Sequence, residues 1–272
     1  MTLRLRSGQA RAGIAIVVFV VLGAMFAPWL LPWDASSQDL AHRLSGPSWQ
    51  HWFGLDELGR DILARVLLGA RVSLLVGFIV VGVSSVVGLA VGAISGYYGG
   101  TIDQVIGRVM DVLMAFPGML LAIALVAVLG PSLTNVVLAL AVIGWVGYAR
   151  LVRGQVLRAR EFDYVVAARA LGSGTFRILT LHVLPTAIPP VLVQATLGMA
   201  GAILSEAALS FLGLGVQPPT PSWGTMINGG RAHLLDAPHL TIFPGIFLAI
   251  VVLGFNFVGD GLRDAIDPKR KK

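Results

Sequence analysis

The stretch VLMAFPGMLLAIALVAVLGPSLTNVVLALAVIGWVGYA, Val112–Ala149, decides the fold of this chain because it contains no charged residue. A helix needs about 20 apolar residues to cross the hydrocarbon core of a bilayer. The stretch is therefore long enough for two crossings. Gly130, Pro131 and Ser132 lie at its middle and are typical of a turn. We predict two adjacent membrane helices joined at these three residues.

Similar uncharged runs flank this stretch: Ala12–Trp33, Val72–Ile102, Val183–Ser205 and Leu240–Gly259. The whole chain is 56% hydrophobic and 12% charged, whereas soluble domains carry about 25% charged residues. The first run is expected to stay uncleaved, because no A-x-A-like site closes it. We predict an all-α integral membrane protein with six transmembrane helices, at residues 14–32, 72–96, 110–130, 133–149, 186–208 and 240–259.

The basic residues predict how the chain is inserted. With the N-terminus inside, all Lys and Arg residues lie in inner segments or at the termini, except Arg43, Arg60, Arg65, Arg71 and Arg231. Cytoplasmic loops of membrane proteins carry the excess of Lys and Arg. Both termini are therefore predicted to be cytoplasmic. Because this topology explains the basic charge, nucleic-acid binding is not expected.

The outer segments divide the chain into two parts. Residues 1–71 are expected to hold the first transmembrane helix and an outer amphipathic helix within Trp52–Arg71, where Leu55, Leu58, Ile62 and Val66 recur at helical spacing. Residues 72–272 are expected to form a five-helix core. The outer segment Gly213–Gly230 is rich in Pro and Gly but uncharged. We expect it to fold back onto the helix ends as a lid or a docking surface.

Small residues repeat every four positions along the second predicted helix, at Ser84, Gly88, Gly92 and Gly96. Such a stripe lets another helix approach closely. The partner helix could belong to the same chain or to a second membrane subunit, and the sequence favours neither.

The longest cytoplasmic segment, residues 150–185, is predicted to form two short helices with an elbow between them. Asp163 is expected to cap a helix over Tyr164–Leu171 that ends at Gly172. Ser173 is expected to cap a second helix over Gly174–Val183, which Pro185 stops. A face of small alanines on such a helix is suited to a groove in another protein.

Chemistry on this chain is not expected. A Walker A loop needs a Lys after its glycines, and every Lys of this chain lies within its last four positions. The histidines His42, His51, His182, His233 and His239 are scattered without metal-ligand spacing. We therefore predict that the chain is not an enzyme and binds no metal or cofactor.

The expected transport pathway contains neutral polar groups. Ser84, Ser85, Gln194 and Thr196 lie at the predicted helix centres, and Glu206 lies near the outer face. A secondary transporter driven by an ion gradient is the alternative function. Such proteins place Asp, Glu or His near the middle of the membrane, and the predicted helix centres lack these residues.

The cytoplasmic segment resembles the loop signature of binding-protein-dependent ABC importer permeases, which reads Glu-Ala-Ala, three residues, Gly, nine residues and Ile-x-Leu-Pro. Ala167, Ala168, Gly172, Leu184 and Pro185 match at this spacing, whereas Val166 replaces the Glu and His182 replaces the Ile. The chain resembles the C-type permease subunit of the dipeptide/oligopeptide/nickel branch through three further stretches: HWFGLDELGRDILARVLLGARVSLL (His51–Leu75), DVLMAFPGMLLA (Asp111–Ala122) and LSFLGLGVQPPTPSWGTMI (Leu209–Ile227).

This resemblance implies a type I ABC importer permease in a prokaryotic plasma membrane, moving di- or oligopeptides. It implies four kinds of partner: a second homologous permease in a heterodimer, two ATPase subunits that bind ATP and Mg, an extracytoplasmic substrate-binding protein, and membrane lipid. The cytoplasmic segment would then be the coupling helix that inserts into an ATPase. Its coupling residues would be Tyr164, Ala167, Ala168, Arg169, Gly172, Ser173, Leu184 and Pro185.

Overall fold

The computed structural model describes residues 8–31 and 34–266 as an all-α fold, which confirms the predicted class. Strand pairing within these residues is limited to one bridge between Leu55 and Asp61. A π-helical segment, Leu179–Val183, joins α7 to α8. The α-helices are α1 Gly8–Leu30, α2 Ile62–Tyr98, α3 Gly100–Ala115, α4 Gly118–Leu129, α5 Leu133–Ala159, α6 Asp163–Ala170, α7 Thr175–Ile178, α8 Leu184–Phe211, α9 Trp223–Gly230 and α10 His239–Ile266.

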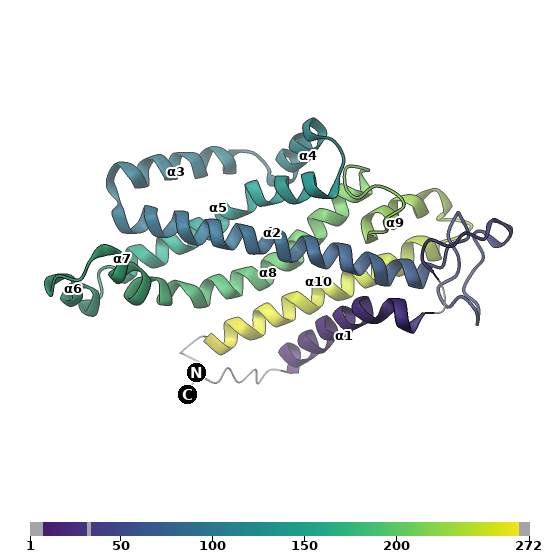
Figure 1. The fold of residues 1–272 in the computed structure, drawn as a ribbon, viewed down its shortest axis with the longest axis horizontal. Coiled ribbons are helices and arrows are strands. Elements are labelled where there is room, and N and C mark those ends of the chain that lie inside the picture. The colour runs from purple at the N-terminus through teal and green to yellow at the C-terminus, as the bar shows by residue number, and fades with distance from the viewer. Residues whose placement is uncertain (1–7, 32–33, 267–272) are drawn as a thin grey trace.

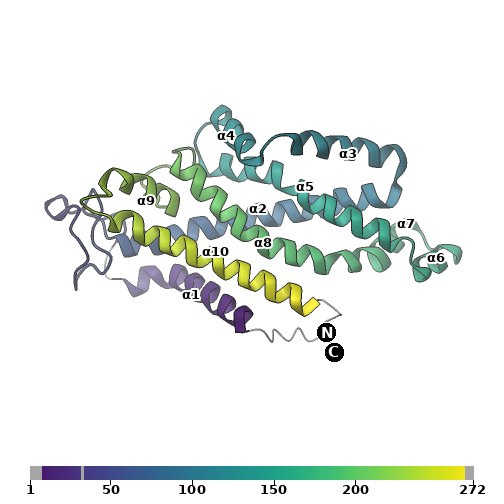
Figure 2. The same ribbon diagram turned by 180° about the vertical axis from the view of Figure 1, so that it is seen from behind.

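The long helices lie side by side along the longest axis of the molecule (Figures 1 and 2). α5 packs against α2, α8 packs against α2, α5 and α10, and α1 packs against α10. α6 and α7 lie at one end of this bundle, which we name the α6–α7 end (Figure 1). α9 and the connection between α1 and α2 lie at the other, the α9 end. The bundle therefore has two ends built from different segments.

Five of the described helical runs are long and apolar enough to cross a membrane, and a sixth span is present if α3 and α4 form one broken crossing. The predicted helix over residues 110–130 is therefore wrong as a single straight element. α3 and α4 meet at an angle of 85°. Phe116 has extended backbone angles, because a residue that precedes a proline is disfavoured in the α conformation. Pro117 thus breaks the helix.

The predicted turn at Gly130–Ser132 is confirmed, because α4 ends at Leu129 and α5 begins at Leu133. The Ser132 side chain accepts a hydrogen bond from the Asn135 backbone amide and caps α5. The predicted end at residue 149 was too early. α5 continues to Ala159, and Arg153 on this extension pairs with Asp103 of α3.

The predicted outer amphipathic helix within residues 52–71 is wrong. Gly54 and Gly59 have positive φ angles of 79° and 71°, a conformation that a helix does not contain. Residues 52–61 form turns instead. The Asp61 carboxylate accepts a hydrogen bond from the Ala64 amide at 2.8 Å, so α2 begins at Ile62 and runs through the predicted boundary at residue 71. Leu55, Ile62 and Val66 are buried.

The stripe of small residues on α2 packs within the chain. A Cβ atom on Gly88 would overlap Tyr148, and one on Gly92 would overlap the backbone oxygen of Ala149. At Gly96 the added Cβ would lie 2.9 Å from the Arg153 backbone oxygen. All three contacts belong to α5. The stripe therefore lets α2 and α5 of one chain approach closely.

Candidate coupling and transport sites

The segment between α5 and α8 forms the predicted elbow at the α6–α7 end. α6 ends at Ala170, and Gly172 follows with a φ of 79°, a left-handed conformation that only glycine adopts without strain. α7 then begins at Thr175 and continues through the π-helical segment into α8. The elbow is confirmed. Its second helix differs from the prediction, because it does not stop before the membrane helix.

Three local predictions on this segment are wrong. Asp163 is the first residue of α6, and the capping position belongs to Phe162. Gly174 occupies the capping position of α7, so Ser173 does not cap it. Pro185 does not stop a helix, because it lies in the first turn of α8, directly after the π-helical segment Leu179–Val183.

The elbow exposes large apolar side chains. Leu171 is 87% exposed, Phe176 is 79% exposed and Leu181 is 60% exposed. Val165 and Ile178 are buried and anchor the two short helices. Apolar side chains that cluster at an exposed surface often mark a contact with another protein.

The predicted coupling residues lie together around this elbow. The Tyr164 hydroxyl donates a hydrogen bond to the His182 backbone oxygen at 3.2 Å, which joins α6 to the π-helical segment. The Arg169 guanidinium lies 6.0 Å from the centre of the Tyr97 ring. Of the others, Ala167, Ala168, Gly172 and Ser173 lie on α6 and the turn, whereas Leu184 and Pro185 begin α8.

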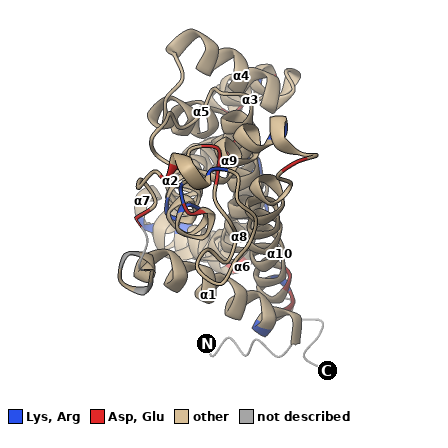
Figure 3. Ribbon diagram, turned by 90° about the vertical axis from the view of Figure 1, so that its right-hand side faces the viewer, with Lys and Arg blue, Asp and Glu red and all other residues tan. Residues whose placement is uncertain are grey.

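The α9 end is held by buried charges. The Asp56 carboxylate accepts a hydrogen bond from Arg60 Nε at 2.7 Å and lies 3.3 Å from Arg65 Nε. All three side chains are buried. Viewed from this end, acidic residues (red) and basic residues (blue) lie beside α2 and α9 (Figure 3). Arg65 also donates to the Ala35 backbone oxygen at 3.3 Å. The connection after α1 is thereby fastened to α2.

Glu206 of α8 is fully buried at the same end. Its two carboxylate oxygens accept hydrogen bonds from the Ser73 hydroxyl of α2 at 2.8 Å and the Ser210 hydroxyl of α8 at 2.7 Å. The Ser222 side chain, which caps α9, is a third partner. One carboxylate therefore joins three elements. Glu206 lies near the outer segments, as predicted, and contacts the folded loop through Ser222.

The outer segment after α8 folds back onto the helix ends, as predicted. Trp223 of α9 is fully buried, and its indole N–H donates to the Val66 backbone oxygen at 3.0 Å. A Cβ on Gly224 would overlap the Ala207 backbone oxygen, so α9 lies directly on α8. Whether the segment acts as a lid or a docking surface stays a prediction.

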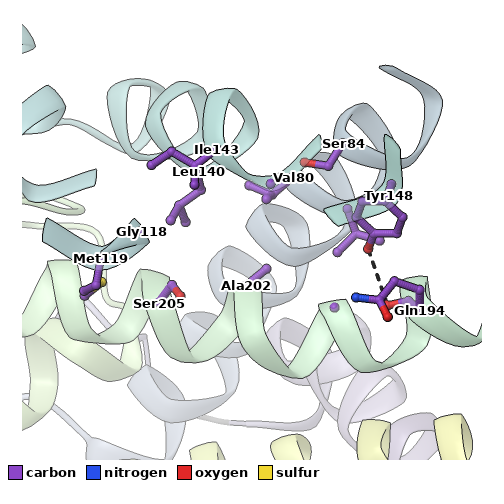
Figure 4. A pocket seen from close by; sticks show the side chains of 13 residues that line it. Val80, Ser84, Gly118, Met119, Leu140, Ile143, Tyr148, Gln194, Ala202 and Ser205 are labelled. Atoms are coloured by element: carbon purple, nitrogen blue, oxygen red, sulfur yellow. Dashed lines mark hydrogen bonds between the residues drawn. The ribbon is translucent and has the colours of Figure 1, made fainter. Parts of the chain in front are cut away.

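A cavity of about 300 Å³ lies within the helix bundle (Figure 4). Ser84 of α2, Tyr148 of α5, and Gln194 and Ser205 of α8 supply its polar groups. The rest of the lining is apolar or glycine. The structure thus brings together two of the five predicted pathway residues, Ser84 and Gln194.

The other three pathway residues lie elsewhere. The Ser85 hydroxyl donates to the Gly82 backbone oxygen at 3.0 Å, and the Thr196 hydroxyl donates to the Leu192 backbone oxygen at 2.8 Å. Both hydroxyls are satisfied within their own helices, and neither residue lines the cavity. Glu206 also lies outside its lining. Among the described residues, no group of three His, Asp or Glu side chains is arranged to hold a metal ion.

Sequence reasoning missed several residues of these sites. Ser73 and Ser222 had no local signal, because their partner Glu206 lies on another element. Tyr148 and Ser205 lie within uncharged runs that predicted only membrane crossing. A helical projection of α8 would have placed Ser205 near the Gln194 face, since eleven residues make about three turns.

Comparison with known proteins identifies the family. Residues 88–272 match the family described as binding-protein-dependent transport system inner membrane component. Residues 5–47 match the N-terminal TM domain of oligopeptide transport permease C. The first match covers more than half of the chain.

Two curated relatives are similar over nearly the whole chain. The dipeptide transport system permease protein of Alkalihalophilus pseudofirmus is 48% identical over 262 residues, which cover 96% of this chain and 86% of the relative. The glutathione transport system permease protein of Escherichia coli O6:K15:H31 is 46% identical over 267 residues, which cover 98% of this chain and 88% of the relative.

A solved structure shows the same fold. The MetNI methionine ABC transporter, in an inward-facing conformation, aligns with a TM-score of 0.58 and 19% identity, covering 74% of this chain and 96% of that chain. At this identity the likeness concerns the fold alone. The family match, the two relatives and the shared fold lead to one conclusion: this chain belongs to the binding-protein-dependent transport system inner membrane components and is a multi-pass permease subunit of an ABC importer.

Proposed function

We propose that this permease moves di- or oligopeptides into the cell with energy from ATP hydrolysis on partner subunits. The named relatives transport a dipeptide and glutathione, and both solutes contain peptide bonds. The chain itself has no Walker A lysine, so we place ATP and Mg on the partners and assign no enzymatic step to this chain.

The observation that carries the proposal is the elbow at the α6–α7 end. It exposes Leu171 in the turn after α6, Phe176 on α7 and Leu181 on the π-helical segment, and an apolar face on a short helical element is a form that seats in a groove. We propose that this surface docks onto an ATPase subunit. The α6–α7 end would then be cytoplasmic, in keeping with its many arginines.

The remaining partners follow from this assignment. We propose a heterodimer with a second homologous permease, two ATPase subunits and a substrate-binding protein outside the membrane. The described α9 end would face that binding protein. We keep residues 1–71 as the N-terminal part and residues 72–272 as the permease core, with α2 running through the boundary. Glu206 is proposed to hold the outer end of the pathway in shape.

Reconstituted vesicles test the driving force. The chain, its partner permease, both ATPases and the binding protein should take up a labelled dipeptide only when ATP is supplied. Uptake should persist when the proton gradient is collapsed. Uptake that runs on an ion gradient without the ATPases would instead establish the secondary transporter.

A second experiment tests the elbow. Ala168→Arg places a long cation on α6 and should lower the amount of co-purified ATPase while the chain still inserts into the membrane. Ala170→Arg is a control on the same helix for the effect of added charge. Unchanged co-purification and uptake in the Ala168 variant would make the elbow a spacer between membrane helices.

A further inference from the structure

The central cavity contains a buried hydroxyl without a protein partner. Ser84 is 1% exposed, and its Oγ has no hydrogen-bond partner among the described residues. A buried polar group left unpaired costs about 1–3 kcal/mol. An alanine at this position would avoid that cost. The hydroxyl is directed to the cavity in Figure 4, so a group inside the cavity is its available partner.

Two glycines make room for the hydroxyls of the lining. A Cβ on Gly144 of α5 would lie 2.5 Å from Ser84 Oγ. A Cβ on Gly198 of α8 would overlap the Tyr148 hydroxyl. Any larger residue at either position would therefore push a hydroxyl aside. Glycines on two different helices thus leave both polar groups facing the same space.

The lining selects for a neutral ligand. No residue that lines the cavity is charged. Its polar groups are the hydroxyls of Ser84, Tyr148 and Ser205 and the amide of Gln194, all of which form neutral hydrogen bonds. Moving an ionised carboxylate or ammonium into such a site without a counter-charge is strongly unfavourable. A cavity of about 300 Å³ is at the small end of ligand pockets.

We propose that this cavity binds one internal, uncharged residue of the transported peptide, with its peptide group hydrogen-bonded to Ser84 and Gln194 and its side chain against the apolar lining. This inference rests on the proposed function, because it names the part of the solute that this chain contacts. The charged termini of the solute stay outside the cavity. The site therefore favours peptides with an uncharged side chain at the bound position.

The chain offers matched controls for this site. Ser84 and Ser85 are adjacent serines of α2, and only Ser84 lines the cavity. On α8, Gln194 lines the cavity whereas Thr196 bonds to its own helix. Ser84→Ala and Gln194→Ala remove the proposed contacts. Ser85→Ala and Thr196→Val make similar changes at positions that do not line the cavity.

The experiment uses the complete transporter and a tripeptide that carries a photoreactive leucine analogue as its central residue. ATP-dependent uptake of this tripeptide by the unmodified transporter is measured first. After illumination, the cross-linked residues are mapped. Cross-links should fall on the segments of α2 and α8 that carry Ser84, Gln194 and Ser205. Their yield should drop about 5- to 10-fold in Ser84→Ala and Gln194→Ala, as expected for one lost hydrogen bond, and stay unchanged in both controls.

Competition gives an independent readout. An excess of an unlabelled tripeptide with a neutral central side chain should suppress the cross-link more strongly than one with Lys or Asp as its central residue. Equal yields in the cavity variants and controls, or a side chain of the partner permease occupying the cavity, would overturn the inference while leaving the proposed function intact. If the unmodified transporter takes up no peptide with ATP, the proposed function fails and the inference with it.

Discussion

The two ends of this permease are built in opposite ways. At the α9 end, Trp223, Glu206 and the ion pair between Asp56 and Arg65 are buried. Each of them joins separate elements of the chain. At the α6–α7 end, Leu171 in the turn, Phe176 on α7 and Leu181 on the π-helical segment lie exposed. The first end satisfies its polar groups within the chain. Both ends also expose large apolar side chains, Trp49 and Leu235 at the first and Phe176 at the second, but no charged side chain of residues 162–183 at the second end is buried.

This difference indicates where stability and assembly are decided. An end whose side chains already have partners contributes to the folding of the single chain. An exposed apolar surface contributes little to that folding, and it gains its partners when another protein covers it. Substitutions at the α9 end should therefore change stability first, and substitutions at the α6–α7 end should change assembly first.

The largest expected effect is at Trp223. Trp223→Ala removes a fully buried ring and its hydrogen bond to Val66, and it should destabilise the chain by about 3–5 kcal/mol. Thermal unfolding of the purified protein in detergent measures the change. Trp49 is 97% exposed, so Trp49→Ala is the matched control and should melt like the parent. Equal melting of the two variants would remove the contrast between the ends.

Glu206 should come second. Glu206→Leu leaves the hydroxyls of Ser73, Ser210 and Ser222 without their shared acceptor, and it should cost about 1–3 kcal/mol. Glu206→Gln keeps a hydrogen-bonding group of similar size and should cost less. Unfolding in detergent and uptake in vesicles should both change more in the Leu variant. Parental uptake in both variants at equal expression would show that Glu206 does not shape the pathway.

Substitutions at Gly172 test the backbone conformation of the elbow separately from its side-chain contacts. Gly172 has a positive φ and Gly174 has a φ of −66°, and a Cβ at either position would meet nothing within 4 Å. Gly172→Val should therefore cost about 1–2 kcal/mol through its left-handed conformation alone. Gly174→Ala is the control. In the Gly172 variant the amount of co-purified ATPase should fall clearly, whereas the melting temperature should change little. A lower melting temperature with unchanged ATPase binding would mean that the elbow contributes to folding instead.

The smallest effect on stability is expected at the exposed apolar surface. Leu171→Ser and Phe176→Ser remove exposed side chains, so the free energy of unfolding should change by no more than about 0.5 kcal/mol. ATPase binding and ATP-dependent uptake should nevertheless fall. A large loss of stability without a loss of ATPase binding would mean that this surface packs within the chain.

The positions of the membrane helices could be predicted from the sequence where local composition alone determines them. The uncharged run at residues 112–149 gave the correct turn at Gly130–Ser132, because Gly and Pro end helices by local backbone restrictions. The end of a short helix at Gly172 was also predicted from local sequence, and Gly172 has a positive φ there. These features depend on neighbours in the chain, so local rules reach them.

Features that depend on distant contacts were not predictable. α2 begins at Ile62 because Gly54 and Gly59 form turns and Asp61 caps the helix, whereas the apolar spacing there favoured a separate amphipathic helix. The carboxylate of Glu206 meets Ser73, which lies 133 residues away in sequence. Ser84 lines the cavity and Ser85 does not, because the rotation of α2 against α5 and α8 decides which of the two faces it. No periodicity in one segment specifies these contacts.

The continuous helical run Thr175–Phe211 gives the molecule a mechanical property. Its 37 residues make a rod about 55 Å long, so a tilt of about 5° at one end displaces the other by about 5 Å. Phe176 lies at one end of this lever, and Glu206 with its attached α9 lies near the other. The π-helical segment and the pair Pro189–Pro190 are points of compliance along its length. The stiffness of the helix at these points therefore determines how much of a displacement at Phe176 is transmitted to α9 and how much is absorbed by bending of the helix.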